Sequence, residues 1–116
     1  MQYAYARLRS ILRKAEGSYK KIEASFFTSD DEGALIRKIL EFPEIVLRAG
    51  ELYSTSTLAT YLYKLAVAAN KFYETTPILK DENVERRKAR LALADMAANT
   101  LRVGLFLLGI EAPEKI

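Results

Sequence analysis

The chain has 116 residues, of which half are hydrophobic, and a formal net charge of +3. This length predicts one domain with its own hydrophobic core, and the apolar content excludes a disordered chain. The chain has no cysteine and no histidine, which excludes thiol nucleophiles, imidazole bases and the usual zinc ligands, so we expect neither catalytic residues nor a metal site.

The first predicted element is a helix over residues 1–15 within an all-α, antiparallel bundle of five to six helices. Apolar residues recur at helical spacing, and no stretch alternates as a strand does. Gly17 is well placed to end this first helix, and a short basic helix is predicted over residues 18–24. The predicted buried stripe of the first helix follows steps of four and three: Ala4, Leu8, Ile11 and Ala15.

The next helix is interrupted by a proline. It should begin near Asp30, because Ser29 and Glu32 have the spacing of a capping box. Pro43 has no N–H to donate and disfavours a helical conformation at the residue before it. The helix should therefore break or kink at Pro43 and resume as a second piece that continues to about residue 53.

The following helix is predicted to end at Pro77, and a hydroxyl from its first residues should cap it. The candidate caps are Thr55, Ser56 and Thr57. Its apolar residues recur at steps of four and three, which predicts a core stripe: Leu58, Leu62, Leu65, Ala69 and Phe72.

The longest predicted helix opens at Asp81 or Glu82 and ends at Gly109 and Pro113. It spans about seven turns and should lie in the centre of the bundle. Its core residues repeat every seven positions as Val84, Leu91, Ala98 and Leu105, with Ala94, Leu101 and Leu108 interleaved.

Positive charge gathers at both ends of the chain. Residues 1–22 hold six cations and one anion, residues 23–60 three cations and seven anions, and residues 61–116 nine cations and seven anions. If the first and last helices pack together, their outer faces form one basic surface. Such a surface favours a polyanion through phosphate attraction that does not depend on sequence.

Tyr3 and Arg7 lie one turn apart on the first helix, outside its apolar stripe. A flat ring beside a planar cation suits an unpaired RNA base, which stacks on the ring and accepts hydrogen bonds from the guanidinium. An ordinary amphipathic helix with a solvated basic face has the same pattern. The residues alone leave both interpretations open.

Six short motifs occur in one order along the chain: QYAYAR at 2–7, FPE at 42–44, TYLYKLA at 60–66, FY at 72–73, ARLALA at 89–94 and LLGIEAPEKI at 107–116. Together they resemble the C-terminal anticodon-binding domain of bacterial arginyl-tRNA synthetase, the DALR domain, from end to end. The chain departs from the family at Tyr5, where many relatives have histidine, and at Lys115 and Ile116, which replace a usual Arg-Met. The resemblance implies one α-helical domain over residues 1–116 that binds the anticodon stem and loop of arginine tRNA.

The resemblance also implies which residues contact RNA. These are Tyr3 and Arg7 of the first motif, Tyr61 of the third, and Leu105 in the last helix, with Gln2 as a hydrogen-bonding neighbour of Tyr3. The residue pattern leaves a core role open for Tyr61, which borders an apolar stripe, and for Leu105, which belongs to one.

Other basic residues are candidate phosphate contacts: Arg13, Lys14, Arg86 and Arg87. The last two form a dense group with Lys88 and Arg90. This group is either a solvated helix face or a surface for tRNA phosphates or for a catalytic domain.

The family is a class I ligase whose catalytic domain carries His-Ile-Gly-His-like and Lys-Met-Ser-Lys-like signatures. Neither occurs here, and no glycine-rich phosphate loop is visible. The resemblance implies that the chain alone is not an enzyme and holds no cofactor, since ATP would bind the catalytic domain that the chain lacks. The implied partners are the anticodon loop of arginine tRNA and that catalytic domain, and we expect the isolated domain to be monomeric.

Two other classes remain: a free-standing helical interaction module without an RNA role, and a self-contained enzyme, which the lack of histidine and cysteine disfavours. No charge-free apolar run reaches the roughly 18–20 residues of a membrane span, and arginines interrupt any apolar N-terminal signal. We expect no membrane contact and a cytoplasmic location.

Overall fold

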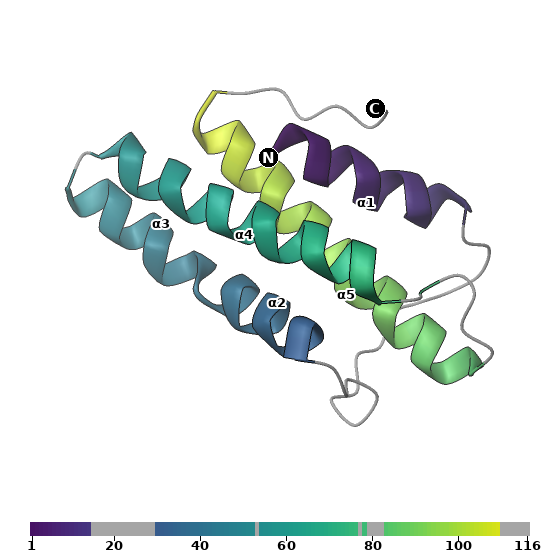
Figure 1. Ribbon diagram of the computed structural model, residues 1–116. Coiled ribbons are helices and arrows are strands. Elements are labelled where there is room, and N and C mark those ends of the chain that lie inside the picture. The colour runs from purple at the N-terminus through teal and green to yellow at the C-terminus, as the bar shows by residue number, and fades with distance from the viewer. Residues whose placement is uncertain (15–29, 53, 77, 79–82, 110–116) are drawn as a thin grey trace.

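The computed structural model describes residues 1–14, 30–52, 54–76, 78 and 83–109 (Figure 1). These residues are helical and include no strand, as predicted. The helices are α1 (Gln2–Lys14), α2 (Asp30–Leu40), α3 (Phe42–Glu51), α4 (Thr55–Thr75) and α5 (Val84–Leu107). The helix predicted over residues 18–24, with Ala15 and Gly17, lies outside the described residues, so the helix count of the whole chain stays a prediction.

Helix α4 packs against each of the other four helices. It runs antiparallel to α2 and α3 on one side and to α5 on the other (Figure 1). Helix α1 packs along α5, also in the opposite direction, and touches α4 (Figure 1). Within the part of the chain that the structure describes, no helix combines the length and the apolar character of a membrane span.

The predicted break at Pro43 separates α2 from α3. Helix α2 begins at Asp30 and ends at Leu40, and α3 begins at Phe42 with Pro43 in its first turn, where a missing N–H costs no hydrogen bond. The break lets α2 and α3 follow α4 as two separate segments.

The cap of α4 lies one residue before the predicted candidates. The hydroxyl of Ser54 accepts a hydrogen bond from the backbone N–H of Thr57 at 3.4 Å, and Ser54 has extended backbone angles. Thr55, Ser56 and Thr57 already have helical geometry, so they form the first turn instead of capping it.

Helix α5 begins at Val84, two to three residues later than Asp81 or Glu82. The side chain of Asn83 caps it by accepting from the backbone N–H of Arg86 at 3.0 Å. Val84, predicted as core, is 45% exposed because it opens the helix beyond the packed region. Gly109 ends the helix as predicted, with φ +79°.

The two core stripes predicted for α4 and α5 are confirmed apart from Val84 and Leu108, which is half-buried. The helices approach closely at Gly104, where an added Cβ would collide with the side chain of Leu62. Glycine is therefore the residue that permits this contact between α4 and α5.

Helix α1 buries a wider face than predicted. Its buried residues are Ala4, Tyr5, Ala6, Leu8 and Leu12, while Ile11 is only half-buried. Because α1 contacts both α4 and α5, two sides of the helix are covered, and a single stripe underestimates the burial.

A buried ion pair joins α2 to α5. The Nε of Arg90 lies 3.4 Å from Oε2 of Glu32, and its Nη2 lies 3.4 Å from Oε1, so the ion pair is bidentate. The Arg90 side chain is therefore part of the core and not part of a solvated basic face, which corrects its grouping with Arg86, Arg87 and Lys88.

Candidate nucleic-acid interface

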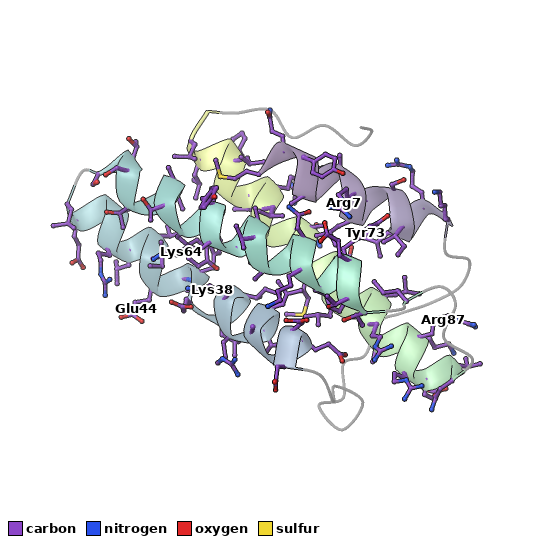
Figure 2. The ribbon with its side chains drawn as sticks, viewed as in Figure 1. Arg7, Lys38, Glu44, Lys64, Tyr73 and Arg87 are labelled. Carbon is purple, nitrogen blue, oxygen red and sulfur yellow. The ribbon has the colours of Figure 1, made fainter. Side chains whose placement is uncertain are left out.

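The side chain of Arg7 lies among residues of α1 and α4, with Arg7 and Tyr73 labelled in Figure 2. Its Nη1 donates to Oδ1 of Asn70 at 3.2 Å and forms an ion pair with Oε1 of Glu74 at 3.1 Å. The guanidinium carbon lies 4.1 Å from the centroid of the Tyr73 ring and 5.0 Å from that of Tyr3. We call Tyr3, Arg7, Asn70, Tyr73 and Glu74 the Arg7 cluster.

Helical spacing on two helices builds this cluster. Tyr3 and Arg7 are four residues apart on α1, and Asn70, Tyr73 and Glu74 are three and four residues apart on α4, so each set shares a face. The packing of α1 on α4 brings the two faces together.

The Arg7 cluster has the chemistry that recognises an unpaired base. Two aromatic rings offer stacking faces, the guanidinium offers donors, and the Asn70 amide offers both a donor and an acceptor. Tyr3 is 53% exposed, so its ring is accessible to a ligand. Cation–ring contacts hold the Arg7 guanidinium in one orientation, which lowers the entropy lost on binding.

Arg7 differs from a solvated arginine. It lies off the apolar stripe as predicted, but only 12% of its side chain is exposed because α4 residues surround it. The sequence analysis does not predict the contacts of Asn70 and Tyr73 with Arg7. Their spacing could have indicated a shared polar surface, because Asn70, Tyr73 and Glu74 lie on one face outside the core stripe of α4.

Tyr61 and Leu105 lie in the core, and their contact with RNA stays a prediction. Tyr61 is 4% exposed, its hydroxyl donates to the backbone carbonyl of Lys38, and its ring stacks on Phe42 at 5.9 Å. Burial raises the pKa of the Tyr61 hydroxyl, and the nearby Glu41 carboxylate raises it further. Leu105 has no exposed surface.

A profile of the DALR anticodon binding domain family matches residues 1–116. The chain belongs to this family. The arginine–tRNA ligase of Porphyromonas gingivalis is 42% identical over the whole chain, which covers 20% of that protein. The corresponding ligase of Chloroflexus aurantiacus is 40% identical over the whole chain, which covers 21% of it.

Solved structures give the same assignment. The arginyl-tRNA synthetase of Thermus thermophilus matches 99% of this chain with a TM-score of 0.89 and 40% identity, and the match covers 20% of that chain. The Plasmodium falciparum arginyl-tRNA synthetase matches 98% with a TM-score of 0.79 and 33% identity, again over 20% of its length. This DALR domain thus spans about a fifth of the proteins that it matches.

The other basic residues of the DALR domain lie outside the Arg7 cluster. Arg13 and Lys14 are exposed in the last turn of α1, and Arg86 and Arg87 are half-buried in the first turn of α5. Arg9 forms an ion pair with Asp95 at 3.2 Å that links α1 to α5. Phosphate contact by Arg13, Lys14, Arg86 and Arg87 stays a prediction. Among the described residues, no group of acidic side chains is arranged to hold a metal ion.

Proposed function

We propose that this domain binds the anticodon stem and loop of arginine tRNA as the anticodon-binding part of an arginyl-tRNA synthetase. Its family and the names of its relatives support this function. The observation that carries it is the guanidinium of Arg7, which lies over the rings of both Tyr3 and Tyr73, with Tyr3 exposed.

The genetic code gives the proposal a defined target. Arginine codons are CGN and AGR, so every arginine anticodon has C in the middle. Cytosine presents an amino donor beside acceptors. The Tyr3 ring supplies a stacking face, and the guanidinium of Arg7 and the amide of Asn70 supply partners for both kinds of group.

The rest of the reaction belongs to a partner domain in this proposal. Because the chain covers 20% of its relatives, we assign ATP binding and ligation to the catalytic domain of the parent synthetase and no cofactor to this chain. We further propose that the isolated domain is a monomer, that the parent enzyme is cytoplasmic, and that Gln2, Arg13, Lys14, Arg86 and Arg87 contribute to RNA binding.

Two stem-loop RNAs test the proposed function. One carries an arginine anticodon, and the other differs only by U in place of the middle C, which exchanges a donor for an acceptor. We expect at least about tenfold weaker binding of the second RNA by fluorescence anisotropy, or about 1.4 kcal/mol. Equal affinities would contradict anticodon reading, and no binding of either RNA would favour a protein-interaction module.

Glu74 should oppose RNA binding. Its carboxylate is 61% exposed and forms an ion pair with the Arg7 guanidinium. An anionic ligand that approaches Arg7 is therefore repelled by the negative charge of Glu74. We expect Glu74→Gln to strengthen stem-loop binding by about 0.2–1 kcal/mol, the usual value of an exposed ion pair. The measurement is anisotropy at low salt.

Glu51→Gln provides the control, because Glu51 is exposed at the end of α3 and the substitution makes the same change in net charge. We expect little effect from it, since Glu51 lies outside the Arg7 cluster. If Glu74→Gln weakened binding, Glu74 would serve to orient Arg7 instead.

A further inference from the structure

A polar groove of about 440 Å³ lies between α4 and the α2–α3 pair, away from the Arg7 cluster. Lys38 and Lys64, on its two sides, are labelled in Figure 2. Its lining combines three cations with three hydroxyl groups: Lys38, Arg48, Lys64, Ser56, Thr57 and Thr60. Cations beside hydroxyl donors are the groups that bind phosphate oxygens in proteins.

The charge of this groove is only partly neutralised within the protein. Glu41 is the one acidic residue among the described residues of its lining, and it pairs with Lys38 at 3.2 Å. Arg48 pairs with Glu44 at 3.6 Å, and both side chains are more than half exposed, so this pair contributes little. Among the described residues, none forms an ion pair with the exposed Lys64. A bound anion would therefore gain more attraction from the cations of the groove than the cations would lose from their existing ion pairs.

The start of α4 adds a positive potential to the same groove. Ser56 and Thr57 lie in the first turn of this 21-residue helix, where the helix dipole favours an anion, although the N–H and the hydroxyl of Thr57 already donate to the Ser54 hydroxyl. Tyr61 at the groove adds no negative charge, because its hydroxyl donates to the Lys38 carbonyl and burial raises its pKa. The cations of α2, α3 and α4 and the first turn of α4 thus favour the same kind of ligand.

We propose that the groove binds a phosphate of the RNA backbone, on the same RNA whose base contacts the Arg7 cluster. This inference rests on the proposed function. Lys64 and Asn70 are six residues apart on α4, or about 9 Å along its axis and about 120° around it, so an RNA strand that contacts both sites must curve around α4. In this proposal the groove contributes affinity for the RNA backbone, and the Arg7 cluster recognises the base.

The test measures how stem-loop affinity depends on salt for the 116-residue chain and for Lys64→Ala and Arg48→Ala. Each variant should lower the slope of log K against log salt by about one, since one phosphate contact is lost. The decrease in slope should be equal for the stem-loops with C and with U in the middle of the anticodon. Lys71→Ala is the matched control, because Lys71 is an exposed lysine of α4 outside the groove, and its slope should be unchanged.

The results separate this proposal from the proposed function. If the parent chain prefers C but Lys64→Ala and Arg48→Ala leave the slope unchanged, the groove proposal alone is overturned. If the parent chain shows no preference while both variants lower the slope, anticodon reading fails and the groove is supported. Absence of RNA binding by the parent chain overturns both, and an equal effect of Lys71→Ala overturns the assignment to this groove.

Discussion

Glu32→Ala is expected to lower the free energy of unfolding by about 3–5 kcal/mol, because it removes the Glu32 carboxylate from a buried ion pair with the guanidinium of Arg90. Glu32 is fully buried and Arg90 nearly so, and their two contacts of 3.4 Å join α2 to α5. Chemical denaturation followed by circular dichroism measures the loss directly.

Asp30→Ala is the control for this prediction. Asp30 lies in the same first turn of α2 and carries the same charge, but it is exposed. Its removal should cost within about 1 kcal/mol, the value of a charge at a helix start. The double variant Glu32→Leu with Arg90→Met should recover much of the stability, since it removes both charges together. A Glu32→Ala variant as stable as Asp30→Ala would show that the pair does not hold α2 on α5.

Helical periodicity predicted the core well, because apolar residues three and four positions apart lie on the same face of a helix and are buried together. Leu58 and Leu101, each within such a repeat, are both buried as predicted. The cap of α4 was misplaced because Ser54 precedes three further hydroxyl residues that are equally good caps by type. Local composition therefore located the helix without fixing its first residue.

Contacts between helices were the part that sequence reasoning missed. Glu32 and Arg90 are 58 residues apart, and Arg7 and Asn70 are 63 residues apart, so neither pair shows in a helical repeat. Tyr61 illustrates the same limit: it borders the core stripe of α4, and the packing of α2 and α3 on α4 decides that it is buried. The family resemblance directed attention to Tyr3 and Arg7, and the packing of α1 on α4 adds Asn70, Tyr73 and Glu74 to them.

Arg7→Ala is expected to weaken stem-loop binding toward the upper end of about 1–3 kcal/mol, or roughly 100-fold. The substitution removes a charged donor and also frees the rings of Tyr3 and Tyr73 from the cation between them. Stability should fall by about 1–2 kcal/mol as well, since the guanidinium also bonds Asn70 and Glu74. Anisotropy well below the melting temperature measures the affinity, and a thermal melt measures the stability.

Arg9→Ala distinguishes recognition from simple loss of stability. Arg9 lies on the same helix and is partly buried, and Arg9→Ala would lose an ion pair with Asp95 of α5, a residue outside the Arg7 cluster. It should lower stability without a comparable loss of RNA affinity. Arg7→Lys should keep the salt dependence, because the charge remains, and yet lose much of the preference for C, because an ammonium lacks the planar fork that stacks between rings. If Arg9→Ala weakened binding as much as Arg7→Ala, the cluster would be only a structural link between α1 and α4, and the base would have to be read elsewhere on the domain.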